Sequence, residues 1–523
     1  MENSREPGKY WGMQLLAVFC ALALGIWILY VNKSYYHDDA YITLRYVWNF
    51  LNGNGIVWND GEFVQGYSNF LHLALITAFG LTGADLVWLS RAIGLFAFSA
   101  LVLVLAVFLV TSTRTSPRRR VLWHIPVIFT LTSAPMIVWS IGGLGDTLLA
   151  FFTASGCLLF MAAIDQPGKR RLLAASGICF ALGYLAHPDG LVFVCMSMLW
   201  LFVTARQSRT LRSALAFAVP CLLILGIYTL WQYFYYGDIV PNTFYAKAGN
   251  FTIHRLATGA RYIQTYALQP PYLPILILAT LLFGFVSGKL HWNSKLTYLA
   301  LLISAYGSFI VYIGGDHMRA FRLILPLVVP MACLLYLLLT AMVGASSRMA
   351  ASLLTLAVLL LSTLQLGQEQ LNPMVEDPAS RVGTLIGKYI AVAWPQGSLI
   401  ALNTAGSTPY YAPRNRYIDM LGLNDRHIAK RHIDKIQLPL QHRPGHLKGD
   451  GVYVLSRKPD FIILGPSNGK DISHPWFLSD LEIGRDPRFA QQYAGHSVML
   501  GIHDDSGQVS EVLFTYYQRV TQQ

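Results

Sequence analysis

Two adjacent carboxylates, Asp38 and Asp39, are the residues of this 523-residue chain best suited to acid–base chemistry. They follow the first long apolar segment, where ionised groups are costly unless they reach water or perform a task. One carboxylate could act as a general base toward a hydroxyl, while its neighbour raises the pKa of the first or binds a metal ion. If residues 41–46 continue as a helix, Asp38 shares a face with Arg45. The alternative is a solvated loop in which an Asp caps an interfacial helix.

A second polar group is the sequence His187-Pro188-Asp189-Gly190. The Asp189-Gly190 pair favours a tight turn, whereas His187 at a membrane face could bind an anionic group or a sugar. We predict that His187 contacts the donor substrate.

Residues 235–247 combine aromatic rings, hydrogen-bond donors and one cation. Aromatic faces stack on sugars or isoprenoid chains, and Lys247 could neutralise a phosphate. Asn242 and Tyr245 are predicted donor contacts on the same grounds. The alternative is an aromatic belt with a snorkelling lysine.

Residues 314–322 bring an acid, an imidazole and two guanidiniums to the end of an apolar span. Arg319 and Arg322 are three residues apart, so on a helix they would form a fork suited to a lipid phosphate. Asp316 and His317 complete this predicted donor-binding group.

The chain must hold these groups in a membrane. Its residues are 54% hydrophobic and only 13% charged, with a mean hydropathy of +0.44, whereas soluble domains carry about a quarter charged residues. The net charge of +12 lies in short clusters between apolar segments, which argues against nucleic-acid binding. We predict a polytopic α-helical protein of the lipid bilayer.

About eleven apolar segments are long enough to be considered as spans. They lie at about 11–31, 88–111, 121–141, 146–165, 172–186, 189–204, 213–234, 271–288, 296–313, 322–344 and 349–366. The first is expected to be an uncleaved span, and residues 68–80 to lie against the membrane within an external loop at 32–87. Basic clusters at 114–120, 169–171 and 206–212 then share one side, which the positive-inside rule makes cytoplasmic.

The polar clusters described above all fall on the opposite side. We therefore expect a bacterial cytoplasmic (inner) membrane protein with an extracytoplasmic active site. Residues 1–366 would form the transmembrane catalytic domain, and residues 367–523 a soluble α/β domain outside the membrane. In that domain a helix is predicted at 381–394, and strands at 398–402, 460–464, 497–502 and 511–517.

The sequence contains no P-loop, dinucleotide fingerprint or HExxH zinc signature. An external active site also has no routine supply of sugar nucleotides. A lipid-borne activated donor that arrives through the bilayer fits both facts.

Several short motifs resemble those of one enzyme family in order and sidedness. They are Asp38-Asp39-Ala40-Tyr41-Ile42-Thr43-Leu44-Arg45-Tyr46, Gly61-Glu62 with Gly66-Tyr67, Gly237-Asp238 with residues 241–247, Gly314-Gly315-Asp316, and residues 419–425. This set resembles the mycobacterial terminal arabinofuranosyltransferases (AftB-like) among the GT-C membrane glycosyltransferases. Where that family often has Gly-Leu-Glu-Thr and Arg-Pro, this chain has Gly145-Asp146-Thr147 and His187-Pro188.

The resemblance implies a GT-C fold and transfer of a pentose, arabinofuranose, from a polyprenyl-phosphate donor to an extracytoplasmic glycan or glycoprotein acceptor. It places the essential acid on the first external loop, at Asp38 or Asp39, with Asp38 slightly favoured because it shares a face with Arg45. Arg45 is then a predicted donor contact. The lipid-linked sugar is a substrate, and a divalent cation is left open as a cofactor. In the tail, Tyr410, Tyr411, Arg414 and Asp419 are predicted to contact the acceptor.

Two alternatives also fit the sequence. The same fold could use another lipid-linked sugar. A protein of another class, a lipid or glycan transporter, could use the outer carboxylates to gate passage, although the nearly charge-free spans count against it.

Overall fold

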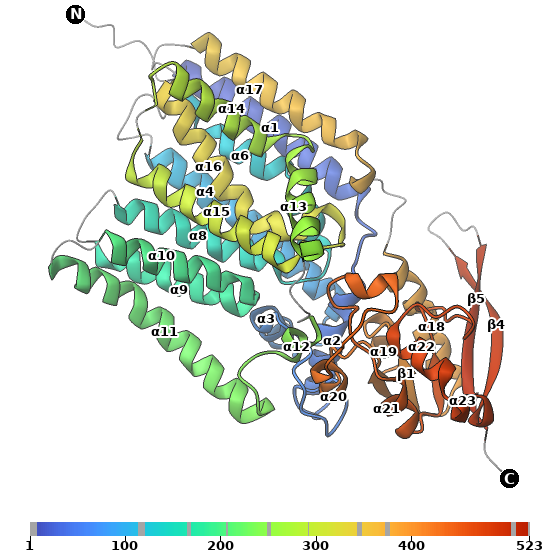
Figure 1. Cartoon of the computed structure of the whole chain (residues 1–523). Coiled ribbons are helices and arrows are strands. Elements are labelled where there is room, and N and C mark those ends of the chain that lie inside the picture. Colours follow the sequence, from blue (N-terminus) through green and yellow to red (C-terminus); the bar gives the residue numbers. More distant parts are fainter. Residues whose placement is uncertain are drawn as a thin grey trace, which may run out of the picture.

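The computed structural model describes residues 8–112, 121–164, 169–204, 208–247, 253–290, 292–342, 348–371, 377–503 and 509–520. Long helices form one bundle, and the C-terminal residues form a mixed layer of helices and strands beside one end of it (Figure 1). The topology signals predicted at Arg114, Arg118, Arg119, Arg120 and Arg206 lie outside the described residues.

Seven helical segments are long and apolar enough to cross a membrane, so the chain is a helical, multi-pass membrane protein. They lie in α1 (Gly8–Val31), α4 (Leu86–Ser112), α8 (Asp146–Ile164), α11 (Ser208–Tyr236), α15 (Ser294–Ile313), η3 with α16 (Arg319–Ile324 and Leu325–Met342), and α17 with η4 (Arg348–Thr363 and Leu364–Gly367). An eighth span results if α6 (His124–Thr132) and α7 (Ala134–Ile141), which meet at 50°, count as one.

The remaining three predicted spans are helical but short. They correspond to α9 (Arg170–Ala186), η2 with α10 (Pro188–Gly190 and Leu191–Val203) and α14 (Leu273–Val286). Each has fewer than 18 residues. The predicted count of eleven spans is therefore not confirmed, although every predicted segment contains a helix.

The first loop carries two helices, α2 (Asp38–Leu51) and α3 (Phe70–Gly80). Helix α2 begins at the carboxylate pair, and the His37 ring caps it by accepting a hydrogen bond from the Asp39 N–H at 3.2 Å. Helix α3 has 11 residues, too few to span a bilayer. Two further helices, α12 (Asn242–Lys247) and α13 (Ile253–Ala267), lie between α11 and α14.

The C-terminal residues form a five-stranded sheet in the order β2-β1-β3-β5-β4. Strand β1 (Leu399–Leu402) runs parallel to β2 (Arg416–Asp419) and β3 (Phe461–Ile463), and β5 (Val509–Arg519) pairs antiparallel with β3 and β4 (Tyr493–His503). The other elements are η5 (Glu369–Leu371), α18 (Pro378–Ala393), α19 (Ser407–Tyr411), α20 (Arg426–Lys430), η6 (Pro439–His442), α21 (Gly451–Ser456), α22 (Leu478–Arg485) and α23 (Pro487–Gln492).

The predicted helix and four predicted strands are confirmed. Strand β2 was not predicted: it has only four residues, begins at the exposed Arg416, and ends at Asp419, which was predicted to contact the acceptor.

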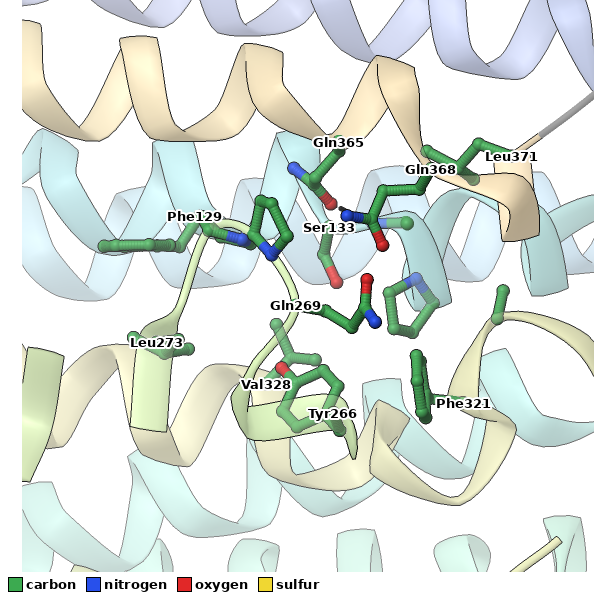
Figure 2. Close-up of a pocket in the computed structure, with 15 residues that line it drawn as sticks. Phe129, Ser133, Tyr266, Gln269, Leu273, Phe321, Val328, Gln365, Gln368 and Leu371 are labelled. Carbon is green, nitrogen blue, oxygen red and sulfur yellow. Dashed lines mark hydrogen bonds between the residues drawn. The ribbon is translucent and has the colours of Figure 1, made fainter. Parts of the chain in front are cut away.

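A glutamine holds the break between α6 and α7. The Gln365 amide donates to the Thr132 carbonyl at 3.0 Å and accepts from the Ala134 N–H at 3.2 Å. Figure 2 shows Gln365 reaching toward Ser133 beside a cavity of about 30 Å³. The side chain thus satisfies backbone groups that the interrupted helix leaves unpaired in an apolar setting.

Replacing Gln365 with leucine should leave these buried backbone groups without partners. We expect a loss of roughly 1–3 kcal/mol in the free energy of unfolding, seen as a lower melting temperature in detergent. Gln368→Leu at the same cavity is the matched control, since Gln368 is less buried. Equal melting temperatures for Gln365→Leu and wild type would contradict the assigned role.

Candidate active site

A cavity of about 1080 Å³ opens where the helical bundle meets the C-terminal layer. One wall is apolar and comes mainly from α10 and α15, including Leu191, Met196 and Phe309. The polar part of the lining combines the start of α2, the 315–319 loop and loops of the C-terminal sheet. The cavity therefore joins a lipid-like surface to a charged one.

The Asp38 carboxylate is buried and already hydrogen-bonded within the protein. It accepts hydrogen bonds from the Ser407 N–H at 2.8 Å and the Ser407 hydroxyl at 2.6 Å. The adjoining Gly406 must be glycine, since a Cβ there would lie 2.1 Å from the Asp38 carbonyl oxygen. Burial and the nearby Asp377 raise the pKa of Asp38 to about 6 despite the bonds from Ser407. Asp38 therefore joins α2 to the C-terminal layer.

Asp39 lines the same cavity but has no hydrogen-bond or ion-pair partner for its carboxylate among the described residues. Burial opposes its ionisation, yet His37 and Lys247, with other nearby cations, outweigh burial and hold the pKa of Asp39 below its usual range. Asp39 is thus an ionised acceptor facing the cavity. The slight preference for Asp38 from the sequence is not supported by this geometry, because Asp38 is bound to Ser407.

Arg322 is held by acids at the rim. Its guanidinium lies 2.8 Å from Asp316 and 3.8 Å from Asp146. Burial opposes ionisation of Asp316, but Arg322 and His317 lower the pKa of Asp316 to about 2. Ala320 and Phe321, with φ of 54° and 49°, interrupt the segment, so Arg319 and Arg322 do not share one regular helical face as predicted. Both arginines nevertheless line the cavity.

The predicted residues His187, Lys247 and His317 also line the cavity. His187 lies 3.1 Å from Asp189. Lys247 forms no ion pair within the part of the chain that the structure describes. Burial lowers the pKa of His317 to about 4, so this ring is neutral at pH 7. Eight of the predicted residues line the cavity: Asp38, Asp39, His187, Lys247, Asp316, His317, Arg319 and Arg322.

Arg45 lies outside the cavity and is almost fully buried. Its guanidinium donates to the carbonyls of Trp58, Pro409 and Asn415. In this structure Arg45 thus does not reach the cavity, and all three of its partners are protein carbonyls. Arg45 and Asp38 do share a face, and that face holds the C-terminal layer.

Asn242 and Tyr245 also point elsewhere. The Asn242 amide donates to the carbonyls of Gly422 and Leu423 at 2.9 and 3.0 Å. The Tyr245 hydroxyl donates to Asp238 at 3.0 Å, and neither side chain lines the cavity. These two predicted donor contacts instead connect loops.

The four predicted acceptor contacts do not line the cavity. Tyr410 and Tyr411 pack on Tyr41, with ring centroids 5.3 and 5.6 Å away. Arg414 is exposed and lies 3.4 Å from Gln396. Asp419 is buried at the end of β2, where it accepts hydrogen bonds from Leu421 and Asn424. In this structure the two tyrosines take part in packing and Asp419 in turn formation, while Arg414 lies at the surface.

Several residues that line the cavity were not predicted from the sequence. Asp377 accepts a hydrogen bond from the Asp38 N–H at 2.7 Å, and the His446 ring lies 5.3 Å from that of His317. No local pattern marks either residue. Asn403 could have been found, since it is a polar residue directly after a predicted strand of the kind that ends at ligand sites.

Among the described residues, no group of three His, Cys, Asp or Glu side chains is placed to hold a metal ion. A divalent cation stays a prediction.

Residues 368–513 match the family model of a domain of unknown function, DUF8728. A terminal beta-(1→2)-arabinofuranosyltransferase of Corynebacterium glutamicum is 26% identical over 350 residues, which are 59% of this chain and 49% of that protein. The protein of the same name from Mycobacterium tuberculosis is 24% identical over 50% of this chain and 42% of its own length. The chain thus spans about half the length of the curated relatives it matches, or less.

A solved structure supports the fold. The oligosaccharyltransferase AglB of Archaeoglobus fulgidus, in complex with an inhibitory peptide and a dolichol-phosphate, is 13% identical and has a TM-score of 0.54. The match covers 96% of this chain and 74% of AglB. The predicted resemblance is confirmed: this chain has a GT-C glycosyltransferase fold and is similar in sequence to terminal arabinofuranosyltransferases.

Proposed function

We propose that this protein transfers arabinofuranose from a polyprenyl-phosphate donor to a glycan or glycoprotein acceptor outside the bacterial inner membrane. The observation that carries the proposal is Asp39, whose carboxylate has no partner among the described residues and lies in a cavity with one apolar wall and several cations. The names of the two sequence relatives support the sugar and the reaction type.

The apolar wall suits an isoprenoid chain. Leu191, Met196 and Phe309, from α10 and α15, offer aliphatic and aromatic surface to the cavity. A lipid chain in that position would bring its phosphate to the polar wall. The similar AglB structure contains a dolichol-phosphate, a ligand of the same chemical class.

Lys247 and Arg319 are the proposed phosphate contacts. Arg322 is already paired with Asp316, so it would act on the phosphate through its remaining donors and its charge. Lys247 carries no ion pair to a described residue, and its ammonium can compensate the charge that develops on the leaving phosphate.

The proposed chemistry is one displacement at the anomeric carbon. The acceptor hydroxyl oxygen forms the new glycosidic bond, and Asp39 takes the hydroxyl proton. The bond from the anomeric carbon to the phosphate oxygen breaks, and the polyprenyl phosphate leaves with that electron pair. Asp38 keeps its bonds to Ser407 and holds Asp39 at the start of α2.

Asp39→Asn should remove the base while preserving side-chain shape. We expect polyprenyl phosphate release from synthetic decaprenyl-phosphoryl arabinofuranose, in the presence of acceptor, to fall by about 100-fold or more. Asp38→Asn is the matched comparison, because asparagine retains an oxygen for Ser407, and its activity should stay within about tenfold of wild type.

Full activity in Asp39→Asn would overturn this role. Absence of release in wild type would favour a transporter, and faster release from another lipid-linked sugar would change the assigned donor.

The pH dependence separates the two carboxylates. A base works in its ionised form, so kcat/KM falls as the pH drops through its pKa. The pKa of Asp39 lies below the ordinary 3.8, whereas that of Asp38 is about 6. We expect kcat/KM to stay flat from pH 7 to pH 5. A decline centred near pH 6, in protein that remains folded, would identify Asp38 as the base.

A further inference from the structure

Loops at the carboxyl ends of the parallel strands form part of the cavity wall. Residues 403–405 follow β1, and Leu421 and Leu423 follow β2. Ligands of open sheets with parallel strands bind at this edge, since the loops there diverge. The C-terminal sheet therefore presents its usual ligand-binding edge to the proposed active site.

Asn403 is the first residue after β1 and is only 2% exposed. Its amide nitrogen donates to the Asp480 carboxylate at 2.9 Å and to the Gly465 carbonyl at 3.2 Å. Both partners are acceptors, so the amide group can point only one way: its nitrogen faces them and its oxygen faces away.

Asp480 is itself held in place. Its carboxylate also accepts hydrogen bonds from the N–H groups of Gly465 and Phe477, at 3.1 and 3.0 Å. The Asn403 side chain is therefore held in a fixed orientation, which a residue that orients a ligand requires.

No residue that the structure describes donates a hydrogen bond to the Asn403 amide oxygen, although Asn403 is buried and lines the cavity. An unsatisfied buried acceptor is unfavourable, and such groups are usually met by water or a ligand. A hydroxyl can donate a hydrogen bond to this oxygen, and a sugar acceptor carries several hydroxyls.

We propose that Asn403 is a specificity residue that accepts a hydrogen bond from a hydroxyl of the acceptor glycan. This inference rests on the proposed function and assigns the acceptor side of the cavity to the carboxyl edge of the C-terminal sheet. The lipid donor occupies the apolar wall formed by α10 and α15.

The test is to titrate full-length, donor-free protein with a synthetic arabinofuranosyl disaccharide and to measure the affinity by calorimetry. Asn403→Ala should weaken binding about tenfold, and Asn403→Ser provides a second variant if the first folds poorly. Among deoxy analogues that each lack one sugar hydroxyl, one should bind wild type more weakly than the parent disaccharide does. Asn403→Ala should bind that analogue as tightly as it binds the parent disaccharide.

Asn415→Ala is the matched control. Asn415 is also buried with an unpaired amide oxygen, but it does not line the cavity. We expect this variant to bind the disaccharide like wild type. In turnover assays, Asn403→Ala should raise KM for the acceptor about tenfold and leave KM for the donor unchanged, a split that general loosening of the fold would not produce.

Unchanged affinity in a folded Asn403 variant, or no disaccharide binding by wild type, would overturn the inference. Failure of wild type to release polyprenyl phosphate would instead overturn the proposed function, and the titration would still decide whether Asn403 binds a glycan.

Discussion

Ser407 donates two hydrogen bonds to the Asp38 carboxylate, and this contact joins residues 369 positions apart in the chain. Arg45 strengthens the same junction through carbonyls of the C-terminal layer, and Asn242 adds a second attachment at residues 422–425. The outer wall of the cavity depends on this junction, because Asn403 and His446 come from the attached layer. The first loop and the C-terminal sheet thus build one site together.

The junction also gives the two neighbouring carboxylates different surroundings. Asp38 is buried against Ser407, while Asp39 turns toward the cavity and has no partner among the described residues. Asp189 and Asp316 are each paired with a cation or histidine at the rim. A single open carboxylate beside Lys247 is an arrangement in which a base and a phosphate-binding cation can act on the same substrate.

The sequence was sufficient for the features that depend on local pattern. Apolar segments predicted the helical membrane protein, and periodicity predicted α18 and four strands. Apolar composition did not separate full crossings from shorter helices such as α10 and α14, which were predicted as spans but have only 13 and 14 residues. Buried polar residues were harder still. Arg45 and Asn242 resemble ligand contacts in sequence, but their partners are carbonyls in distant loops that only the tertiary fold brings near.

The most direct test is a structure of the full-length protein with a non-hydrolysable phosphonate analogue of decaprenyl-phosphoryl arabinofuranose. We expect the lipid chain along α10 and α15, the phosphonate beside Lys247 and Arg319, and the anomeric carbon facing Asp39, with Asp38 still bound to Ser407. A phosphonate bound away from Lys247 and Arg319, or an Asp38 carboxylate released from Ser407 and turned toward the anomeric carbon, would contradict the assigned base and the proposed route of the donor.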